Sequence, residues 1–551
     1  MCIKFCGAFE LALRGHDETS SSENPGIYQG LINFASELDS ALALHLRDAK
    51  VFKGTSKTIQ NDLLDAMFEV YRNELINQIK SAKFIAIEAD ETTDTSNQQQ
   101  MVVIIRYVFN GEIFEKFWAF VKPEGYSADI LANCLMDQLK LILNSPADNS
   151  KLIAQSYDGA AVMSGKNNGV QAIIKNIFPH AHFVHCYAHQ FNLIMERATQ
   201  CNRNIKIFFA NVQSFSTFFS RSPKRTAVLD QVVKRRLPRA VATRWNFKSR
   251  VVNTVFEYNE LLKECLENII DQPGIDSKTI SEASGLLKFL DCPEFMYWLN
   301  MFHRLMPHVE IFFNQAQTRG IESSQMQAAV DQFEQQIVQI RQSFNDLECD
   351  EDEVIHPAKR PRVTSTGDSR STIAKEVLDT ILVHVKDRFD FKDHLNAAKL
   401  FDARSFKSYR KSFPQNHFES TVKSYPMLDS IKLKTELTAI YERDDMCSVD
   451  GVLLVLVFIS ENNLTTVFSE TNKLVDIICT TPMTTVECER CFSTLKRIKT
   501  FLRSTMSEDR LNALATLSIE KKFIQLIPDF DNKVIEVFSK KKDRRMDFLY
   551  K

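Results

Sequence analysis

The fold class of this 551-residue chain is decided by three adjacent strand patterns: residues 84–90 (FIAIEAD), 101–109 (MVVIIRYVF) and 112–120 (EIFEKFWAF). Asn110-Gly111 lies between the last two and predicts a tight hairpin turn. Further strand patterns then alternate with helical ones: strands at 151–157 and 182–185, and helices at about 127–143, at about 169–177 and from about 186. Three meandering strands followed by alternating helices and strands predict a mixed α/β sheet.

The remainder of the chain has mostly helical periodicity. An acidic stretch (ECDEDE, 348–353) precedes a basic, Ser/Thr-rich stretch at 357–370, and this composition predicts a disordered linker over 347–372. The predicted organisation has five parts: an N-terminal helical region at 1–80, the first part of the sheet core at 81–203, a helical insertion at 204–445, a C-terminal region at 446–530 and a basic tail at 531–551.

Composition excludes several classes of protein. No apolar stretch approaches the roughly 20 residues of a membrane span, and the N-terminus lacks the apolar run of a secretory signal. The twelve cysteines are scattered, so we expect reduced thiols in the cytosol or nucleus. The net charge is only −2, yet residues 221–250 contain ten Lys/Arg and one acid. This local excess of positive charge is typical of a nucleic-acid-binding surface.

Two aspartates end predicted strands of the same sheet. Asp90 closes FIAIEAD and Asp158 closes LIAQSYD. Each taken alone is readily explained as a turn-initiating Asp. Together they are typical of a divalent-metal site, because hard cations such as Mg²⁺ or Mn²⁺ take oxygen ligands. The small residues after Asp158 (GAAVMSG) match neither the P-loop nor the dinucleotide-binding fingerprint.

A third candidate acid, Glu489, lies in the sequence VECERCFS at 486–493. When this stretch is read as a helix, an apolar stripe runs along it through Cys488, Cys491, Leu495, Ile498 and Leu502. We therefore expect the Cys-x-x-Cys pair to belong to the core rather than to a redox or zinc site. Glu487 and Glu489 flank the stripe on opposite sides, so only one of them can face a given site.

Two further groups of residues are candidates for binding. Cys186 and His189 resemble half of a zinc site, but no second ligand pair has zinc-finger spacing, so zinc is not expected; contact with phosphate is the alternative. Trp245 lies in TRWN (243–246), between Arg244 and Lys248 at the end of the basic stretch. Its position suits stacking on an unpaired base, and it equally suits a core Trp beneath a solvated basic face.

In combination these motifs resemble the hAT superfamily of DNA transposases, in particular the transposase-derived proteins related to zinc finger MYM-type proteins. The resemblance covers most of the chain. It is carried by RGHDE (14–18), IEADETTD (87–94), SYDGAAVMSG (156–165), HCYAHQFNL (185–193), TRWN and ECERCFSTLKRIKTFLRSTMSEDRL (487–511).

The resemblance implies an RNase H-like catalytic core that is interrupted by a large all-helical insertion and completed by a C-terminal dimerisation region. By this resemblance Asp90, Asp158 and Glu489 match the family's metal-binding catalytic acids. Cys186 and His189 match its C-x-x-H pair, and Trp245 matches a tryptophan linked to the handling of flanking DNA. The chain lacks the cysteine pattern of the N-terminal zinc-binding domain that family members often carry.

The resulting prediction is a nuclear, at least dimeric, hAT-type transposase-like protein. It would bind DNA and cleave or transfer strands with Mg²⁺ or Mn²⁺, without a membrane or small-molecule partner. The alternative is a domesticated, non-enzymatic nuclear interaction protein that keeps the fold and its dimerisation surface. A plain RNase H-like nuclease is a third and weaker class, because such an enzyme needs no dimerisation region. Lys359-Arg-Pro-Arg362 and the basic residues at 540–545 are candidate nuclear localisation signals.

Overall fold

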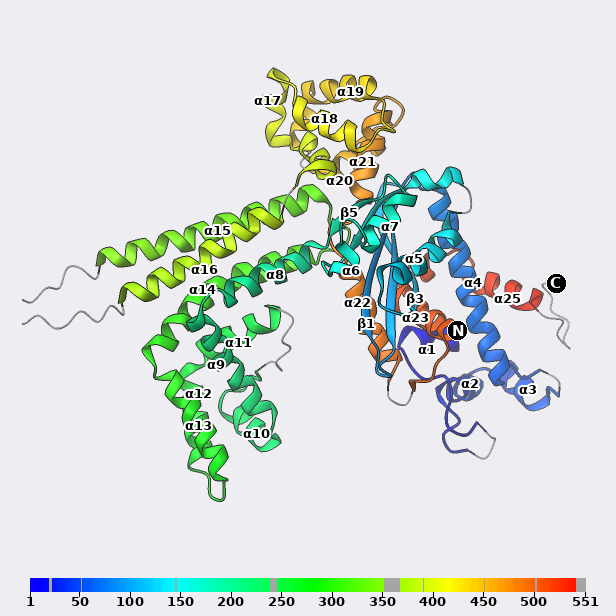
Figure 1. Ribbon diagram of the computed structural model, residues 1–551. Coiled ribbons are helices and arrows are strands. Elements are labelled where there is room, and N and C mark those ends of the chain that lie inside the picture. The colour runs from blue at the N-terminus through cyan, green and yellow to red at the C-terminus, as the bar shows by residue number, and fades with distance from the viewer. Residues whose placement is uncertain are drawn as a thin grey trace, which may run out of the picture. The chain divides into compact units, whose positions relative to one another are not determined.

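The computed structural model describes residues 1–18, 22–50, 52–143, 146–237, 245–350, 367–389, 391–449, 451–500 and 503–541 (Figure 1). The chain forms two compact units. The first unit combines Met1–Cys186 with Asp393–Lys551, and the second is the intervening Tyr187–Lys392. The described part of the chain has no helix that combines the length and apolar character of a membrane span.

A five-stranded mixed sheet with the order β3-β2-β1-β4-β5 forms the centre of the first unit. The strand β1 pairs antiparallel with β2 and parallel with β4, β2 pairs antiparallel with β3, and β4 pairs parallel with β5. All five strands lie where the sequence predicted them: β1 Ile85–Thr93, β2 Gln99–Phe109, β3 Glu112–Val121, β4 Leu152–Tyr157 and β5 His182–His185. This is the predicted RNase H-like mixed sheet.

The sequence explains both the hairpin and the burial of the sheet on its two faces. Asn110 and Gly111 have φ values of 50° and 80°, the positive values that a two-residue hairpin turn requires. Ile85 and Ile87 point to one face and belong to an apolar cluster that also contains residues of α4 and α5. Ala86 points to the other face and belongs to a cluster formed with segments from 397 to 479. The central strands are therefore covered on both sides.

The N-terminal part of this unit is helical, as predicted. The longest of its helices, α4, begins after Ser56, whose side chain accepts a hydrogen bond from the Ile59 amide as an N-cap. Helices also connect β3, β4 and β5. The elements are α1 Cys2–Ala8, α2 Ile27–Leu38, α3 Ser40–Asp48, α4 Lys57–Ser81, α5 Ala128–Ile142, η1 Pro146–Lys151, α6 Ala161–Ser164 and α7 Val170–Ile177.

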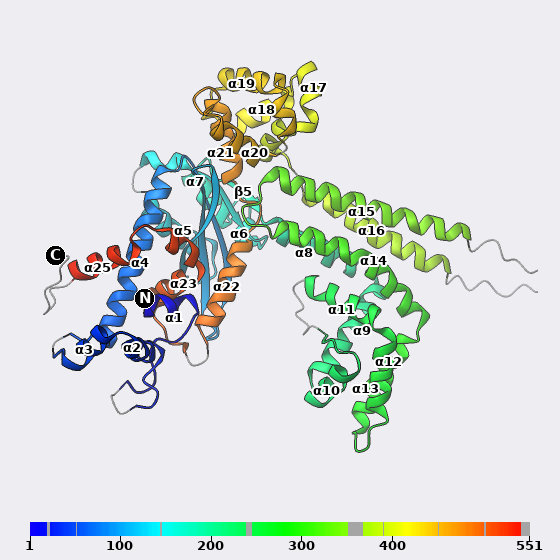
Figure 2. The same cartoon turned by 180° about the vertical axis from the view of Figure 1, so that it is seen from behind.

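The C-terminal segment of the first unit returns to the sheet. Helix α21 contacts β2 and β4, α22 contacts β1 and β2, and α23 contacts β3. Figures 1 and 2 show α22 beside β1 from opposite sides. The elements are η3 Asp393–Phe401, η4 Ala403–Ser405, α17 Phe406–Lys411, α18 Gln415–Ser424, α19 Ser430–Glu442, η5 Asp445–Ser448, α20 Val452–Glu461, α21 Ser469–Thr480, α22 Val486–Ile498, α23 Glu508–Ile519, α24 Lys521–Leu526 and α25 Phe530–Lys540.

The second unit is the predicted all-helical insertion, and its described residues contain no strand. Phenylalanine dominates its interior; the rings of Phe191 and Phe312, for example, lie 4.2 Å apart between centroids. Its helices are α8 Tyr187–Gln200, α9 Arg203–Ser220, α10 Pro223–Val232, α11 Trp245–Glu257, α12 Asn259–Ile270, α13 Ser277–Leu290, α14 Pro293–Ala316, α15 Ser323–Asp350 and α16 Gly367–Arg388.

The boundaries of the helical insertion differ from the prediction. We predicted it at 204–445, whereas the compact helical unit spans Tyr187–Lys392. Leu400, Tyr425 and Leu433 belong to the apolar cluster that also contains Ala86 of the sheet, so residues 393–445 are part of the first unit. Helical periodicity continues without a break through this region, and it identifies a helix without indicating which core the helix joins.

Two smaller corrections concern the predicted linker and tail. The ends of the 347–372 segment belong to helices α15 and α16, while residues 351–366 lie outside the described residues. The first ten residues of the predicted tail at 531–551 are helical: α25 ends at Lys540 and packs against α4 through an amphipathic face with buried Val534 and Phe538. The candidate localisation signal at 359–362 and residues 542–551 lie outside the described residues.

Candidate active site

The register of the sheet places the two candidate aspartates side by side. Glu88 of β1 is the parallel partner of Ser156 of β4. Two residues further along each strand are Asp90 and Asp158, which therefore share an edge and a face of the sheet. Asp90 is still within β1, opposite Val102 of β2, whereas Asp158 follows directly after β4. This is the arrangement expected from the two strand-terminal acids.

Backbone amides orient both aspartates. An oxygen of Asp90 accepts a hydrogen bond from the Glu91 amide at 2.9 Å, and an oxygen of Asp158 accepts one from the Ala160 amide at 3.1 Å. Burial, assisted by the negative charges of Asp158 and Glu489, raises the pKa of Asp90 to about 7. The Asp90 carboxyl therefore titrates near neutral pH instead of near its usual value of about 4.

Glu489 reaches this site from helix α22. The helix presents its apolar stripe to the core, with Cys488, Cys491, Leu495 and Ile498 all buried, as the spacing predicted. Leu502, the last predicted member of the stripe, lies outside the described residues. Glu489 is half-buried beside this stripe, and its charge acts on Asp90 although the two residues are far apart in sequence. Glu487 is instead buried and pairs with Arg490 at 2.8 Å.

Sequence reasoning placed Glu88 on the same face as Asp90 but assigned it no role. Its side chain is fully buried, and neither carboxyl oxygen has a hydrogen-bond partner. Burial raises the pKa of Glu88 well above its usual range, and the charge of Glu115 raises it further, whereas Arg106 lowers it. The nearby Arg106 guanidinium is occupied by Glu115 and by the Cys479 carbonyl. Burial therefore favours the protonated form of the Glu88 carboxyl.

A buried ion pair ties the loop after β1 to the end of α22. Lys499 Nζ lies 2.5 Å from an Asp94 carboxylate oxygen, and both side chains are almost completely buried. The other Asp94 oxygen accepts the amides of Ser96 and Gln98, which closes a tight turn. Thr95 donates to the Lys499 carbonyl. Sequence reasoning missed this pair; the only available signal was the polar ETTDTSNQQQ loop, which gives no indication of a partner.

Cys186 and His189, the predicted C-x-x-H pair, fall in different units. Cys186 is the last residue of the N-terminal segment of the first unit. Its buried sulfur accepts a hydrogen bond at 3.2 Å from the amide of Thr485, which lies immediately before α22. His189 is half-buried in α8 of the helical unit. The nearby His182 ring donates a hydrogen bond from Nε2 to the Ser424 carbonyl and stacks on His394.

Trp245 occupies the core position that the sequence left open as one alternative. It is 2% exposed and makes an edge-to-face contact with Phe209, with ring centroids 5.5 Å apart. Lys248 covers it, with Nζ 4.3 Å from the ring centroid, and burial lowers the Lys248 pKa. A buried ring has no face available for a base. Arg244 lies outside the described residues.

The chemistry of the three acids suits a divalent cation. Asp90, Asp158 and Glu489 supply only oxygen donors, and their mutual repulsion at Asp90 is the kind that a bound cation relieves. The side chains are not closed around such an ion: among the described residues, no group of three or more His, Cys, Asp or Glu side chains is arranged to hold a metal.

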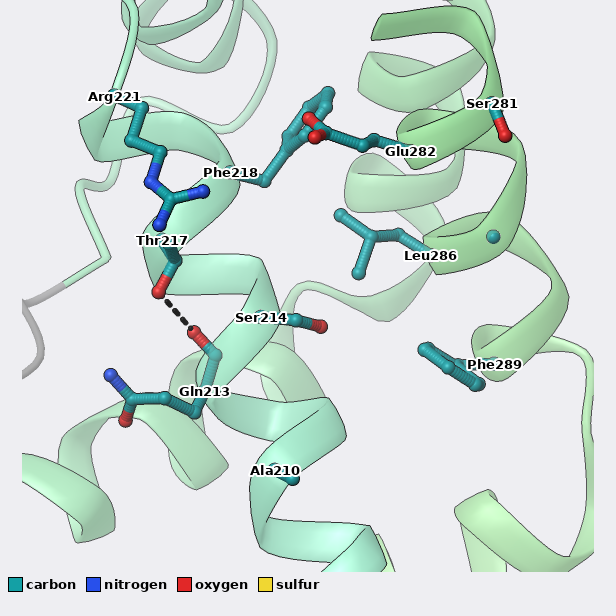
Figure 3. A pocket seen from close by; sticks show the side chains of 11 residues that line it. Ala210, Gln213, Ser214, Thr217, Phe218, Arg221, Ser281, Glu282, Leu286 and Phe289 are labelled. Atoms are coloured by element: carbon teal, nitrogen blue, oxygen red, sulfur yellow. Dashed lines mark hydrogen bonds between the residues drawn. The ribbon is translucent and has the colours of Figure 1, made fainter. Parts of the chain in front are cut away.

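A separate pocket of about 430 Å³ lies within the helical unit between α9 and α13 (Figure 3). Phe218, Leu286 and Phe289 give it an apolar lining, and Arg221 lies at one end. None of the candidate site residues lines it.

Comparison with known proteins identifies two regions of the chain. Residues 1–169 match the family described as ZMYM1/FAM200, RNase-like domain. Residues 449–523 match the hAT family C-terminal dimerisation region. The first match contains Asp90 and Asp158, and the second contains Glu489.

Similar full-length proteins are distant in sequence. The human protein named 52 kDa repressor of the inhibitor of the protein kinase is 20% identical over 512 residues, which cover 84% of this chain and 65% of that protein. The mouse protein of the same name is 19% identical over 516 residues with the same coverage. The chain thus spans slightly less than two thirds of the length of these relatives. Residues 1–169 are thus similar to an RNase-like domain of the ZMYM1/FAM200 type, and residues 449–523 to the dimerisation region of the hAT family, in the order that the motifs predicted.

Proposed function

We propose that this chain acts on DNA by divalent-metal phosphoryl transfer at Asp90, Asp158 and Glu489. The observation that carries the proposal is electrostatic: the charges of Asp158 and Glu489 both raise the pKa of Asp90, although the acids come from β1, the end of β4 and α22. A fold has little structural reason to gather three carboxylates, because their repulsion destabilises it.

The residues of the site have separable roles in this proposal. Asp90 and Asp158 are fixed by backbone amides at the edge of the sheet, and Glu489 approaches from α22. Two divalent ions held there would lower the pKa of the attacking hydroxyl and would stabilise the negative charge that develops on the leaving oxygen. The ion pair between Asp94 and Lys499 positions α22, and through it Glu489, against β1.

The helical unit is proposed to hold DNA through its basic surface. Arg221, Lys224, Lys234, Arg235 and Arg250 are exposed there. Such side chains neutralise phosphates without reading sequence. Trp245 is buried and is not part of this surface. We therefore assign the DNA contact to the exposed lysine and arginine side chains and not to stacking of a base on Trp245.

Self-association is proposed to use helix α20, within the dimerisation region. The helix is apolar on all sides, but only Val452, Val455, Leu456 and Ile459 are buried. Leu454 is 51% exposed on the opposite face. A second copy of the chain would cover this face.

The second candidate function is a non-enzymatic nuclear interaction protein. One observation favours it: the two relatives described above are named as repressors. Both candidates imply the nucleus. Replacing Lys359, Arg360 and Arg362 with Ala in a fluorescent fusion tests whether that motif is the localisation signal.

A strand-transfer assay separates the two candidates. Purified full-length protein is incubated with labelled duplex DNA and Mg²⁺ or Mn²⁺, alongside Asp158→Ala. The matched control is Asp137→Ala, which changes an exposed acid of α5 in the same unit. The enzymatic proposal expects metal-dependent nicking or joining that Asp158→Ala abolishes and Asp137→Ala retains. DNA binding without any metal-dependent product would favour the interaction protein.

A further inference from the structure

Three arginines converge at a place in the first unit that the proposed function does not use. Arg14 belongs to the RGHDE motif between α1 and α2, Arg503 lies in the connection between α22 and α23, and Arg510 is in α23. Both α1 and α4 contact α23, which brings these distant parts of the chain together. We call Arg14, Arg503 and Arg510 the arginine cluster.

The hydrogen bonds of the cluster are unusual for cations. Arg14 and Arg510 both donate to the same side-chain oxygen of Asn61 in α4, which is a neutral amide oxygen. Arg14 also donates to the Lys57 carbonyl at 2.9 Å, and Arg503 donates to the Glu10 carbonyl at 2.9 Å. Within the described residues, the side chains of the cluster therefore donate their hydrogen bonds to neutral oxygens.

A neighbouring arginine, Arg497, differs from the cluster because it pairs with a carboxylate. Arg497 forms a two-pronged ion pair with the Glu10 carboxylate, so its charge is compensated within the chain. Two acids whose charges act on Arg510 also pair with lysines: Glu18 lies 3.4 Å from Lys57, and Asp65 lies 3.8 Å from Lys541. The cluster thus keeps an excess of positive charge.

Burial and repulsion make this arrangement costly without a ligand. Arg14 Nε is buried and has no hydrogen-bond partner. Burial, together with the positive charges of Arg14 and Arg503, lowers the pKa of Arg510 to about 10. Half-buried guanidinium groups that repel one another are stabilised by an anion with several oxygen atoms. A phosphate group provides such oxygens, and their spacing matches the paired N–H donors of a guanidinium group.

We propose that the arginine cluster is a binding site for a phosphate group. The site uses none of the candidate catalytic acids, so it stands independently of the proposed function. A phosphate of the DNA backbone and a free phosphate or nucleotide share this chemistry, and the test below distinguishes these sources.

The first arm of the test measures binding of inorganic phosphate to the full chain by titration calorimetry, at an ionic strength held constant with chloride. Wild type is compared with Arg14→Gln and Arg510→Gln. The control is Arg47→Gln, which changes an exposed arginine paired with Asp48 in the same unit. We expect each cluster variant to weaken phosphate binding by about tenfold or more, since a charge-assisted hydrogen bond is lost. We expect the control to bind as wild type does.

A stability readout excludes a merely structural role for the cluster. Without phosphate, Arg510→Gln should unfold at the same temperature as wild type or a higher one, because it relieves repulsion between cations. Arg497→Gln should unfold at a lower temperature than wild type, because the variant removes the cation that pairs with the Glu10 carboxylate. Both variants change an arginine of the same C-terminal segment.

The second arm measures binding of fluorescent duplex DNA by anisotropy. Weaker DNA binding by Arg14→Gln and Arg510→Gln, with competition by phosphate, identifies the ligand as a backbone phosphate. Unchanged DNA binding together with loss of inorganic phosphate binding identifies a free phosphate or nucleotide. Wild-type protein that binds no phosphate at tens of millimolar concentration, or cluster variants that bind it normally, would overturn the proposal.

Discussion

At the residue scale, the raised pKa of Asp90 has a measurable consequence for stability. The folded state holds the proton up to about pH 7, whereas an unfolded chain releases it near pH 4. Stability from this group is therefore present at low pH and is lost as pH rises between these values. Asp90→Asn cannot ionise, so the variant should gain thermal stability relative to wild type as pH rises from 5 to 8.

The size of this gain follows from linkage, at about 1.4 kcal/mol for each pKa unit. We expect a gain on the order of 1–4 kcal/mol at pH 8, read as a rise in the unfolding midpoint. Asp137→Asn, at an exposed site, should show no pH-dependent difference from wild type. A difference in unfolding midpoint between Asp90→Asn and wild type that does not change with pH would contradict the raised pKa of Asp90.

The individual residues also show where sequence reasoning is sufficient. Asp90 and Asp158 were predicted because strand ends are visible in the pattern of apolar residues. Trp245 was left undecided, because its neighbours in sequence are basic, whereas the ring that it contacts across the core is Phe209 of another helix. Glu88 was not assigned a role, because its environment is made by Arg106, Glu115 and Glu487, which pairing and packing bring together.

At the element scale, the Asp94–Lys499 pair should control how α22 docks against β1. The two residues are 405 positions apart, and both side chains are buried. Burial raises the pKa of Asp94, but the hydrogen bonds from Lys499, Gln98 and Ser96 outweigh this and lower it. Lys499→Met leaves a buried carboxylate without its cation, so we expect a loss of about 3–5 kcal/mol in stability.

A double-mutant cycle checks this prediction. Unfolding midpoints are measured for Lys499→Met, Asp94→Asn and the double variant. The double variant should be more stable than the sum of the single effects predicts, because neither buried charge remains. Strictly additive effects would mean that the pair does not couple the two elements.

The helices and strands show what hydrophobic periodicity can predict and what it cannot. All five strands and the order of the helices follow from local patterns and turn residues such as Asn110-Gly111. The end of the helical insertion was misplaced by some fifty residues, at 445 instead of Lys392. Whether a helix such as α19 joins the sheet core or the insertion depends on contacts that its own sequence does not encode separately.

At the scale of the whole molecule, the exposed face of α20 predicts self-association. We expect the full chain to sediment as a dimer at micromolar concentration and Leu454→Glu to sediment as a monomer. Leu141→Glu is the matched control, because Leu141 of α5 is 54% exposed compared with 51% for Leu454. A wild-type monomer, or a Leu454→Glu dimer, would exclude this face as the interface.

Mn²⁺ binding to the full chain tests whether the acids from β1, the end of β4 and α22 form one metal site. Free Mn²⁺ is measured by electron paramagnetic resonance at pH 6 and pH 8 for wild type, Asp90→Asn, Asp158→Asn, Glu489→Gln and the control Asp137→Asn. We expect wild type to bind Mn²⁺ more tightly at pH 8, where Asp90 is ionised, and each of the three site variants to lose about tenfold or more in Mn²⁺ affinity. Binding that is unchanged by Glu489→Gln would contradict this expectation.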